Sequence, residues 1–204
     1  HYVRHGSGSY TVYYEKACKM IVHYVYGSTR RAAVSDKTAY GRKGSNYSLY
    51  SPTISGYTPT KTVVSGSFSS ESSSTTVYYY ESTYTISFNA NGGSGAPSSI
   101  TKKHFSNATL PNDKPYRSGY TFLGWSTNSN ASSASFQPGA TFYMNASVTL
   151  YAVWKGKTYT VSYNANGGTG APPSQTKHHG IKLLIPSIEP TRSGYTFLGW
   201  AFTS

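Results

Sequence analysis

The stretch RSGYTFLGW, Arg117 to Trp125, returns letter for letter at Arg192 to Trp200, 75 positions later (192 − 117 = 75). The identity extends outward, because residues 84–125 and 159–200 share 26 of 42 aligned positions without a gap. Such self-similarity predicts tandem units of about 65 to 75 residues rather than one or two large domains. Units of that size bury only about 60% of their unfolded surface, so each is expected to be marginally stable alone.

The start of each 75-residue unit has the pattern of a strand followed by a turn. YTISFNANGG begins at Tyr84, and apolar residues alternate with polar ones, which predicts a strand with one buried face. Asn91-Gly92-Gly93 tolerates positive φ, so the strand is expected to end in a tight turn. Further on, Tyr120, Phe122 and Trp125 cannot all share one strand face, which predicts a bend near Gly124. A last strand is expected in NASVTLYAVW.

A second, shorter repetition precedes these units, because Thr11–Tyr14 matches Thr76–Tyr79. We therefore expect residues 1–17 to be the tail of a truncated preceding repeat that ends in a strand. In the following unit, an opening strand, turns or a short helix across 28–46, a strand at Tyr47–Tyr50 and a closing strand are expected. The predicted domains are 1–17, 18–83, 84–157 and 158–204, and the last is expected to be truncated and open-edged.

Composition narrows the class of protein. The chain has 21 tyrosines, few charged residues (12%) and a net charge of +12, which favours strands and turns and permits loose attraction to polyanions. No apolar run reaches the ~18 residues of a membrane span, and no leader opens the chain. Residue 1 is expected to lie inside a longer polypeptide. The single cysteine, Cys18, is expected to be a structural residue.

Two known repeat families resemble different parts of the chain. Residues 19–81, with SPTISGYTP, VVSG and TTVYYYE, resemble a mucin-binding-protein (MucBP-type) repeat. Residues 84–154, with NANGG, RSGYTFLGW and NASVTLYAVW, resemble the internalin-type B repeat, also called the Listeria-Bacteroides repeat. Residues 159–204 match the same family as far as Trp200. An Arg/Lys-rich loop stands where MucBP-type repeats commonly carry acidic residues.

The resemblance implies a fold class and a function. It implies a β-rich α+β protein of tandem small β-grasp (ubiquitin-like) modules in an elongated array. Such modules belong to non-catalytic stalks and adhesins of secreted or wall-attached bacterial surface proteins. The implied location is extracellular, with attachment through regions outside this chain, and the implied partners are anionic glycans: mucin, sulfated polysaccharide or teichoic acid. We expect a monomer without a cofactor.

Catalytic and metal sites find little support in the residue pattern. None of the six acidic residues recurs at an equivalent repeat position, which argues against paired carboxylates duplicated with the module. His104 and His179 do align, but neighbouring histidines on a strand point to opposite faces, so surface histidines are expected rather than metal ligands. The Asn-Gly-Gly turns lack the Gly-Lys-Ser/Thr of a phosphate loop. The sequence therefore predicts a protein that is not an enzyme.

Two groups of residues are candidates for function. Basic residues beside tyrosines could contact a polyanion, with ordinary solubilising charge as the alternative; they are Arg30, Arg31, Arg42, Lys43, Lys102 and Lys103. Nucleic-acid binding is an alternative function, but most aromatic side chains fall at strand positions where they are expected to be packed. The repeated motif is expected to be the packing centre of the module; its residues are Gly119, Tyr120, Phe122, Trp125, Gly194, Tyr195, Phe197 and Trp200. Arg117 and Arg192 are expected to meet solvent.

Overall fold

The computed structural model describes residues 9 and 11–202, which fall into two compact units. Unit 1 extends to Thr83 and includes Lys103–Phe105, and unit 2 holds the remainder of the chain. Every regular element in the described residues is a β-strand, so the predicted α+β class is wrong and the protein is all-β. The crossings that could have been helical are short strands and turns, punctuated by Pro111 and Pro115 in unit 2.

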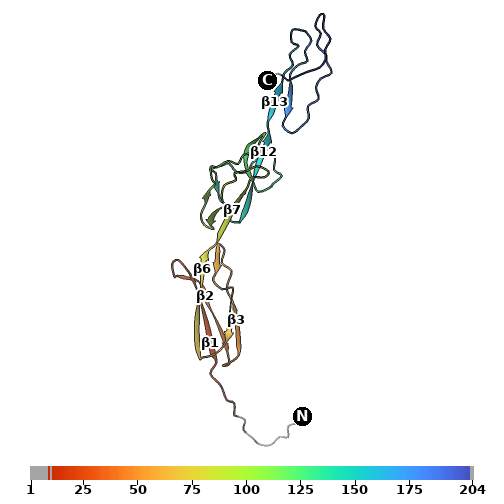
Figure 1. The fold of residues 1–204 in the computed structure, drawn as a ribbon. Coiled ribbons are helices and arrows are strands. Elements are labelled where there is room, and N and C mark those ends of the chain that lie inside the picture. The colour runs from red at the N-terminus through yellow and green to blue at the C-terminus, as the bar shows by residue number, and fades with distance from the viewer. Residues whose placement is uncertain (1–8, 10, 203–204) are drawn as a thin grey trace, which may run out of the picture. The chain divides into compact units, whose positions relative to one another are not determined.

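Unit 1 is built on a mixed sheet with the order β2-β1-β6-β4. The central strands β1 and β6 are parallel, and both edge strands are antiparallel to their neighbours. Figure 1 shows β1, β2 and β6 side by side. A second, two-stranded sheet joins β3 and β5. The strands of unit 1 are β1 (Cys18–Tyr26), β2 (Ala32–Gly41), β3 (Asn46–Tyr50), β4 (Tyr57–Pro59), β5 (Val63–Ser67) and β6 (Ser72–Glu81).

The largest local difference from the sequence prediction is β2. Residues 28–46 were expected to form turns or a short helix, but Ala32–Gly41 is a ten-residue strand. β2 pairs with β1 from Gly41 opposite Cys18 to Ala32 opposite Val25. The segment is therefore held as a strand by its hydrogen bonds to β1, which the local residue pattern does not show. The predicted strand at Tyr47–Tyr50 is confirmed as β3.

Unit 2 is built on a four-stranded sheet with the order β10-β12-β7-β8. The predicted turn is confirmed, with φ values of 49° at Asn91 and 84° at Gly92. The predicted bend is also confirmed, because the pairing of β10 with β12 shifts register between Phe122 and Gly124. The remaining strands are β7 (Thr83–Asn89), β8 (Ile100–Lys103), β9 (Ala108–Thr109), β10 (Tyr120–Ser126), β11 (Thr141–Phe142), β12 (Val148–Gly156), β13 (Thr158–Val161) and β14 (Gln175–His178).

Each unit has its own hydrophobic core. The core of unit 1 contains Val22, Tyr24, Val64, Val77 and Tyr79. The core of unit 2 contains Ile86, Leu110, Trp125, Phe142, Leu150 and Ala152. Most of these residues are inward-facing positions of paired strands, as the two-residue period requires, whereas Leu110 directly follows β9.

The two ends of the described chain contribute little to these cores. Among the described residues, the buried hydrophobic side chains end at Val153, while Leu184 and Leu198 are 87% and 97% exposed. At the other end, Thr11–Tyr14 was expected to be a strand, but residues 11–17 belong to no element. Residues 1–8 and 10 of that predicted tail lie outside the described residues. Within the described chain, no helix is long and apolar enough to cross a membrane.

Candidate functional site

A tight turn before β4 positions the first wall of the candidate site. Gly56 adopts φ +78°, which side-chain-bearing residues rarely tolerate, and the Tyr57 N–H donates to the Ile54 carbonyl at 3.1 Å. The Tyr57 ring packs against the Tyr26 ring, with centroids 4.7 Å apart. In the ladder between β4 and β6, Tyr57 stands opposite Glu81. The turn therefore positions the Tyr57 ring, and the pairing of β4 with β6 places Glu81 beside it.

The turn between β1 and β2 positions the second wall. Tyr80 on β6 is 52% exposed, and its ring lies over Gly27, so a Cβ added there would come within 2.8 Å of Tyr80 Cδ1. The tyrosines alternate along β6, because the preceding Tyr79 is buried in the core and only 1% exposed. The Tyr80 ring therefore faces outward and lies against the backbone of Gly27, where there is no side chain. Ser28 is the next residue of the same turn.

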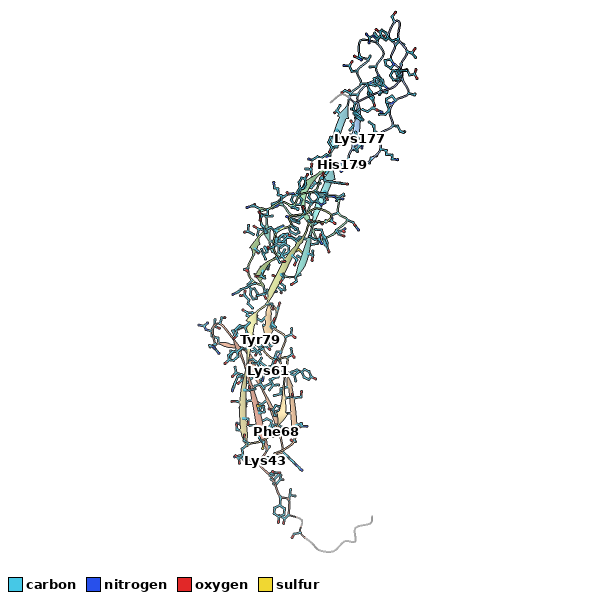
Figure 2. All side chains as sticks on the ribbon, viewed as in Figure 1. Lys43, Lys61, Phe68, Tyr79, Lys177 and His179 are labelled. Carbon is cyan, nitrogen blue, oxygen red and sulfur yellow. The ribbon has the colours of Figure 1, made fainter. Side chains whose placement is uncertain are left out.

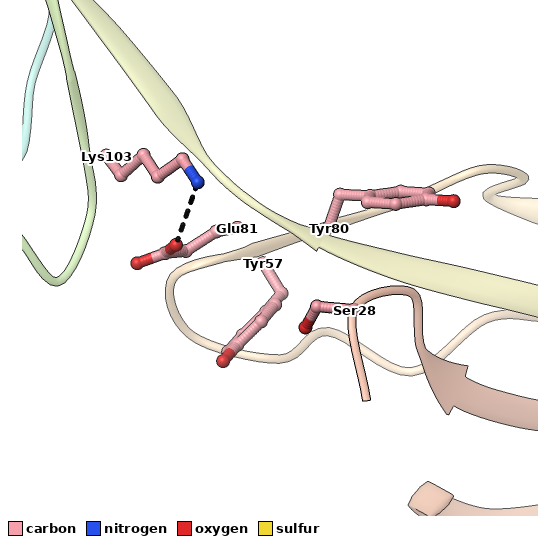
Figure 3. Close-up of a pocket in the computed structure, with 5 residues that line it drawn as sticks. All are labelled: Ser28, Tyr57, Tyr80, Glu81 and Lys103. Atoms are coloured by element: carbon pink, nitrogen blue, oxygen red, sulfur yellow. Dashed lines mark ion pairs between the residues drawn. The ribbon is translucent and has the colours of Figure 1, made fainter. Parts of the chain in front are cut away.

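These two walls enclose an open pocket of about 200 Å³, lined by Ser28, Tyr57, Tyr80, Glu81 and Lys103 (Figure 3). Lys103 Nζ lies 3.9 Å from Glu81 Oε2, so the pocket carries an ion pair beside two aromatic rings. Apolar rings with a few convergent polar groups are the usual lining of a small-molecule site. The pocket is smaller than most drug-sized sites, which span roughly 300 to 1,000 Å³.

The predicted polyanion residues of unit 1 lie at opposite ends of its sheet. Arg30, with φ 59°, and the exposed Arg31 follow Ser28 in the β1–β2 turn, and the Arg30 guanidinium lies 4.7 Å from the centroid of Tyr78. Arg42 and Lys43 occupy the turn after β2, at the end where Cys18 opposes Gly41. The nine residues of β1 place about 26 Å between these ends. Figure 2 shows Lys43 near Phe68, away from Tyr79.

The two adjacent lysines predicted in unit 2 have different environments. Lys102 is only 4% exposed, and its Nζ donates to Asn145 Oδ1 at 2.8 Å. The ammonium also lies 5.4 Å from the centroid of the Tyr84 ring. Lys103 belongs to the pocket of unit 1. Of the six predicted basic residues, Lys103 lines the pocket, Arg30 and Arg31 follow its residue Ser28 along the chain, and Arg42 and Lys43 lie at the other end of the sheet of unit 1.

The repeated motif of unit 2 lies in and around its core. Trp125 is fully buried and packs edge-on against Phe88 and Phe122, with centroid distances of 5.0 and 5.1 Å. Phe122 also contacts Trp154 at 5.6 Å, and Tyr120 is half-buried. Gly119 adopts φ +76° in the turn before β10.

The second copy of the motif repeats these local contacts with greater exposure. Phe197 lies 5.2 Å from Trp200, and Trp200 lies 5.1 Å from Tyr163. Tyr195, however, is 68% exposed, and Gly194 adopts φ +78°. The aromatic cluster therefore forms in both copies, while deep burial is confined to the first.

Groups suited to catalysis are sparse among the described residues. His23 Nδ1 and Asp36 Oδ2 are 2.8 Å apart, but both side chains are more than 40% exposed on paired strands and neither lines the pocket. No cluster of three or more potential metal ligands occurs in the part of the chain that the structure describes. Because it brings two aromatic rings together with an ion pair, we treat the pocket as the candidate site.

Sequence reasoning missed most of the pocket. Lys103 was predicted as a contact residue, but Ser28, Tyr57, Tyr80 and Glu81 were assigned only to turns or strands. One signal was available, because Ser-Gly-Tyr occurs in both repeat types and marks a turn that presents a tyrosine. The proximity of that turn to Ser28 could not be predicted, because the residues are distant along the chain.

Comparison with known proteins gives matches over most of the chain. The Listeria-Bacteroides repeat domain matches residues 84–153 and 159–204. An Evansella cellulosilytica protein provisionally named a Gly-rich membrane protein is 32% identical over 169 residues, covering 80% of this chain and 18% of the relative. A second protein from that organism, provisionally named a membrane protein, is 34% identical over 118 residues, covering 57% and 17%. The chain thus spans less than a fifth of either relative.

Two solved structures are similar to about a third of the chain. One is the type 2 repeat of the mucus-binding protein MUB from Lactobacillus reuteri, with 27% identity, a TM-score of 0.28, and coverage of 33% of this chain and 50% of that one. The other is the mucin-binding domain of a Streptococcus pneumoniae protein, with 24% identity, a TM-score of 0.26, and coverage of 32% and 90%. At these TM-scores the similarity carries no weight for function.

Proposed function

Because the chain belongs to the Listeria-Bacteroides repeat family, we propose that it is a non-catalytic repeat segment of an extracellular, surface-attached bacterial protein. In this proposal the tandem repeats act as a stalk, and unit 1 is an adhesin module that binds acidic glycans. The parallel β1–β6 pair between two antiparallel edge strands supports a β-grasp relationship for unit 1, without the helix. The glycan role depends on the pocket.

The observation that carries the glycan proposal is the pairing of two tyrosine rings with hydrogen-bonding groups in one open pocket. A sugar ring has an apolar C–H face that packs on an aromatic ring and hydroxyls that hydrogen-bond at its edge. Tyr57 and Tyr80 supply the rings, while Ser28, Glu81 and Lys103 supply donors and acceptors. A shallow, open site of this kind favours weak binding that gains avidity from repeated units.

The turn that contains Ser28 also carries two arginines, which favour an acidic ligand. Arg30 and Arg31 follow Ser28 by two and three residues, and Arg31 is exposed. A guanidinium is well suited to bidentate contact with a carboxylate or sulfate. Because Lys103 is already paired with Glu81, the pocket alone is close to neutral, and the arginine turn supplies the preference for an anionic sugar.

The test measures binding of the full chain to sialyllactose, to lactose and to a heparin-derived tetrasaccharide by calorimetry. Tyr80→Ala is expected to abolish measurable binding, whereas Tyr40→Ala, which truncates a 70%-exposed ring on β2, is expected to leave it unchanged. Arg31→Ala is expected to weaken the acidic sugars about tenfold more than lactose, with Arg42→Ala as the matched control. Equal effects of Tyr80→Ala and Tyr40→Ala on binding would show that the pocket does not bind the sugar.

The net charge of +12 supports a second candidate, weak binding of polyanions, nucleic acid included, through charge spread over the surface. Such binding has no fixed site and is screened strongly, because the Debye length is about 8 Å at physiological salt. Elution from heparin resin below physiological ionic strength, unchanged by Arg31→Ala, would favour it. Elution above that ionic strength that depends on Arg31 favours the pocket.

A further inference from the structure

The same Ser-Gly-Tyr turn forms three times in the chain. Its glycines, Gly56, Gly119 and Gly194, adopt φ values of +78°, +76° and +78°. In each turn the tyrosine N–H donates to the carbonyl three residues earlier, at 3.1 Å. The turn is therefore set by local sequence, since it has the same geometry in a MucBP-like and in two Listeria-Bacteroides repeats.

In unit 2 the turn at Gly119 receives two groups that come from later in the chain. The Lys157 N–H donates to the Gly119 carbonyl at 2.9 Å, and the His179 N–H donates to the Lys157 carbonyl at 2.9 Å. The His179 ring occupies the space that a Cβ on Gly119 would take, and it meets the Tyr120 ring edge-on with centroids 5.1 Å apart. A bare glycine face therefore seats a ring from the following repeat.

Unit 1 contains the same arrangement. The Ser82 N–H donates to the Gly56 carbonyl at 2.8 Å, and the His104 N–H donates to the Ser82 carbonyl at 2.8 Å. A Cβ on Gly56 would lie 2.7 Å from both His104 Cδ2 and Phe105 Cζ, so here the histidine ring shares the glycine face with the phenylalanine that follows it. Ser82 and Lys157 are 75 positions apart (157 − 82 = 75), as are His104 and His179 (179 − 104 = 75). The geometry recurs although the linker residue differs, so it depends on backbone, glycine and ring.

The third turn, at Gly194, has the same backbone geometry without a described ring against its glycine. No described residue lies within 4 Å of a Cβ built on Gly194. The arginine that precedes the turn is nevertheless placed alike, because Arg192 lies 4.2 Å from the Tyr195 ring centroid and Arg117 lies 4.0 Å from that of Tyr120. The turn is thus preformed, and the histidine is not needed to shape it.

We propose that the Ser-Gly-Tyr turn is a docking surface for another repeat of this family. The glycine carbonyl accepts the linker N–H, and the glycine face seats the histidine ring that follows β8 or β14. Gly194 presents the same surface to a further repeat of this kind. This inference does not rest on the glycan proposal, because Gly119 and His179 are distant in the chain from the pocket residues and line no part of it.

The test substitutes glycines with matched backbone strain in the full chain. Gly119→Ala, Gly194→Ala and Gly95→Ala all place alanine at φ between +72° and +78°, but of these three glycines only Gly119 has a described ring within 4 Å of the added Cβ. Amide exchange of Lys157 and His179 is the readout, because both N–H groups donate at the junction. Gly119→Ala is expected to reduce their protection about tenfold, and the other two variants to leave it unchanged. Equal losses in all three variants would overturn the proposal.

A second set of variants leaves the glycine intact. His179→Ala is expected to lower the same protection, whereas His178→Ala, at the adjacent exposed position of β14, is expected to have no effect. His179→Phe is expected to restore most of it, because the seat holds a ring face rather than a ring nitrogen. Unchanged protection in His179→Ala, or the same loss in His178→Ala, would show that the ring does not hold the junction.

Discussion

The guanidinium of Arg117 lies 4.0 Å from the centroid of the Tyr120 ring, and its Nη1 donates to the Asn91 carbonyl at 3.4 Å. This arginine joins the Ser-Gly-Tyr turn to the Asn-Gly turn that ends β7. In the other copy, Arg192 Nη1 donates to the Asn166 carbonyl at 3.1 Å. The two most similar stretches of the repeat, NANGG and RSGY, are therefore the two sides of one contact. Contrary to the sequence expectation, Arg117 is half-buried.

Arg117→Ala is expected to destabilise unit 2 by about 1 kcal/mol, because it removes a cation–π contact and a charged hydrogen bond to a backbone carbonyl. Urea unfolding followed by tryptophan fluorescence measures this, since Trp125 and Trp154 both lie in unit 2. Arg42→Ala, in an exposed turn of unit 1, is the charge-matched control. A midpoint identical in the two variants would show that the stacked arginine contributes nothing to stability.

Phe122→Ala is expected to destabilise unit 2 by about 3 kcal/mol, because it opens a cavity between Trp125 and Trp154. Phe197→Ala is the matched substitution in the second copy. It is expected to cost much less, since Leu198 and Tyr195 beside it are exposed and the site can collapse. Denaturation curves of both variants provide the comparison, and equal losses would mean that the two copies are packed alike.

Two buried tyrosines of unit 1 differ in what their hydroxyls contact. The Tyr79 hydroxyl donates to the Pro52 carbonyl at 2.5 Å, whereas the Tyr24 hydroxyl has no hydrogen-bond partner among the described residues. Tyr79→Phe is therefore expected to cost about 1 kcal/mol, and Tyr24→Phe to be neutral or stabilising. Urea unfolding followed by tyrosine circular dichroism measures both. A larger loss in Tyr24→Phe would show that this hydroxyl is hydrogen-bonded in solution.

The same two tyrosines predict a difference between the units at alkaline pH. Burial raises the pKa of Tyr24 and of Tyr79 above the usual 10.0. The folded state therefore favours the neutral phenols, so their contribution is complete below pH 10.0 and is lost as the pH rises toward the folded pKa. Unit 1 is expected to lose stability above about pH 10, before unit 2, whose core cluster contains no tyrosine among the described residues.

Tryptophan fluorescence follows unit 2 alone, because all three tryptophans lie there. Tyrosine circular dichroism has contributions from both units, so the unfolding of unit 1 is the transition that it shows and that fluorescence does not. The double substitution Tyr24→Phe with Tyr79→Phe is expected to remove the alkaline loss from unit 1. Coincident transitions at every pH would contradict the assignment of that loss to these phenols.

Features set by a few adjacent residues could be predicted from the sequence. The Asn91-Gly92 turn and the bend at Gly124 depend on backbone preferences that glycine and asparagine carry with them. β2 was missed because Ala32–Gly41 becomes a strand through its pairing with β1, and its own residues show no clear alternation. The expected helix content came from the family resemblance and from the pattern of residues 28–46, but that segment contains β2, and the proline- and glycine-rich crossings form no helix in the described residues.

The candidate site was harder to predict because its parts are distant in the sequence. The pocket combines Ser28 from one turn, Tyr57 from another and Lys103 from the end of β8. Likewise, the burial of Lys102 depends on Asn145, which is 43 positions away. Charge and residue type identify exposed candidates, but they do not show which side chains meet.

The measurement that tests the glycan role most directly is a chemical-shift titration of the ¹⁵N-labelled full chain with sialyllactose. We expect saturable shifts at Ser28, Tyr57 and Tyr80, with smaller shifts for lactose at equal concentration. We also expect no saturable shifts around Arg42 and Lys43, at the other end of the sheet. Shifts confined to that end, or no saturable shift at the pocket with either sugar, would contradict the glycan role.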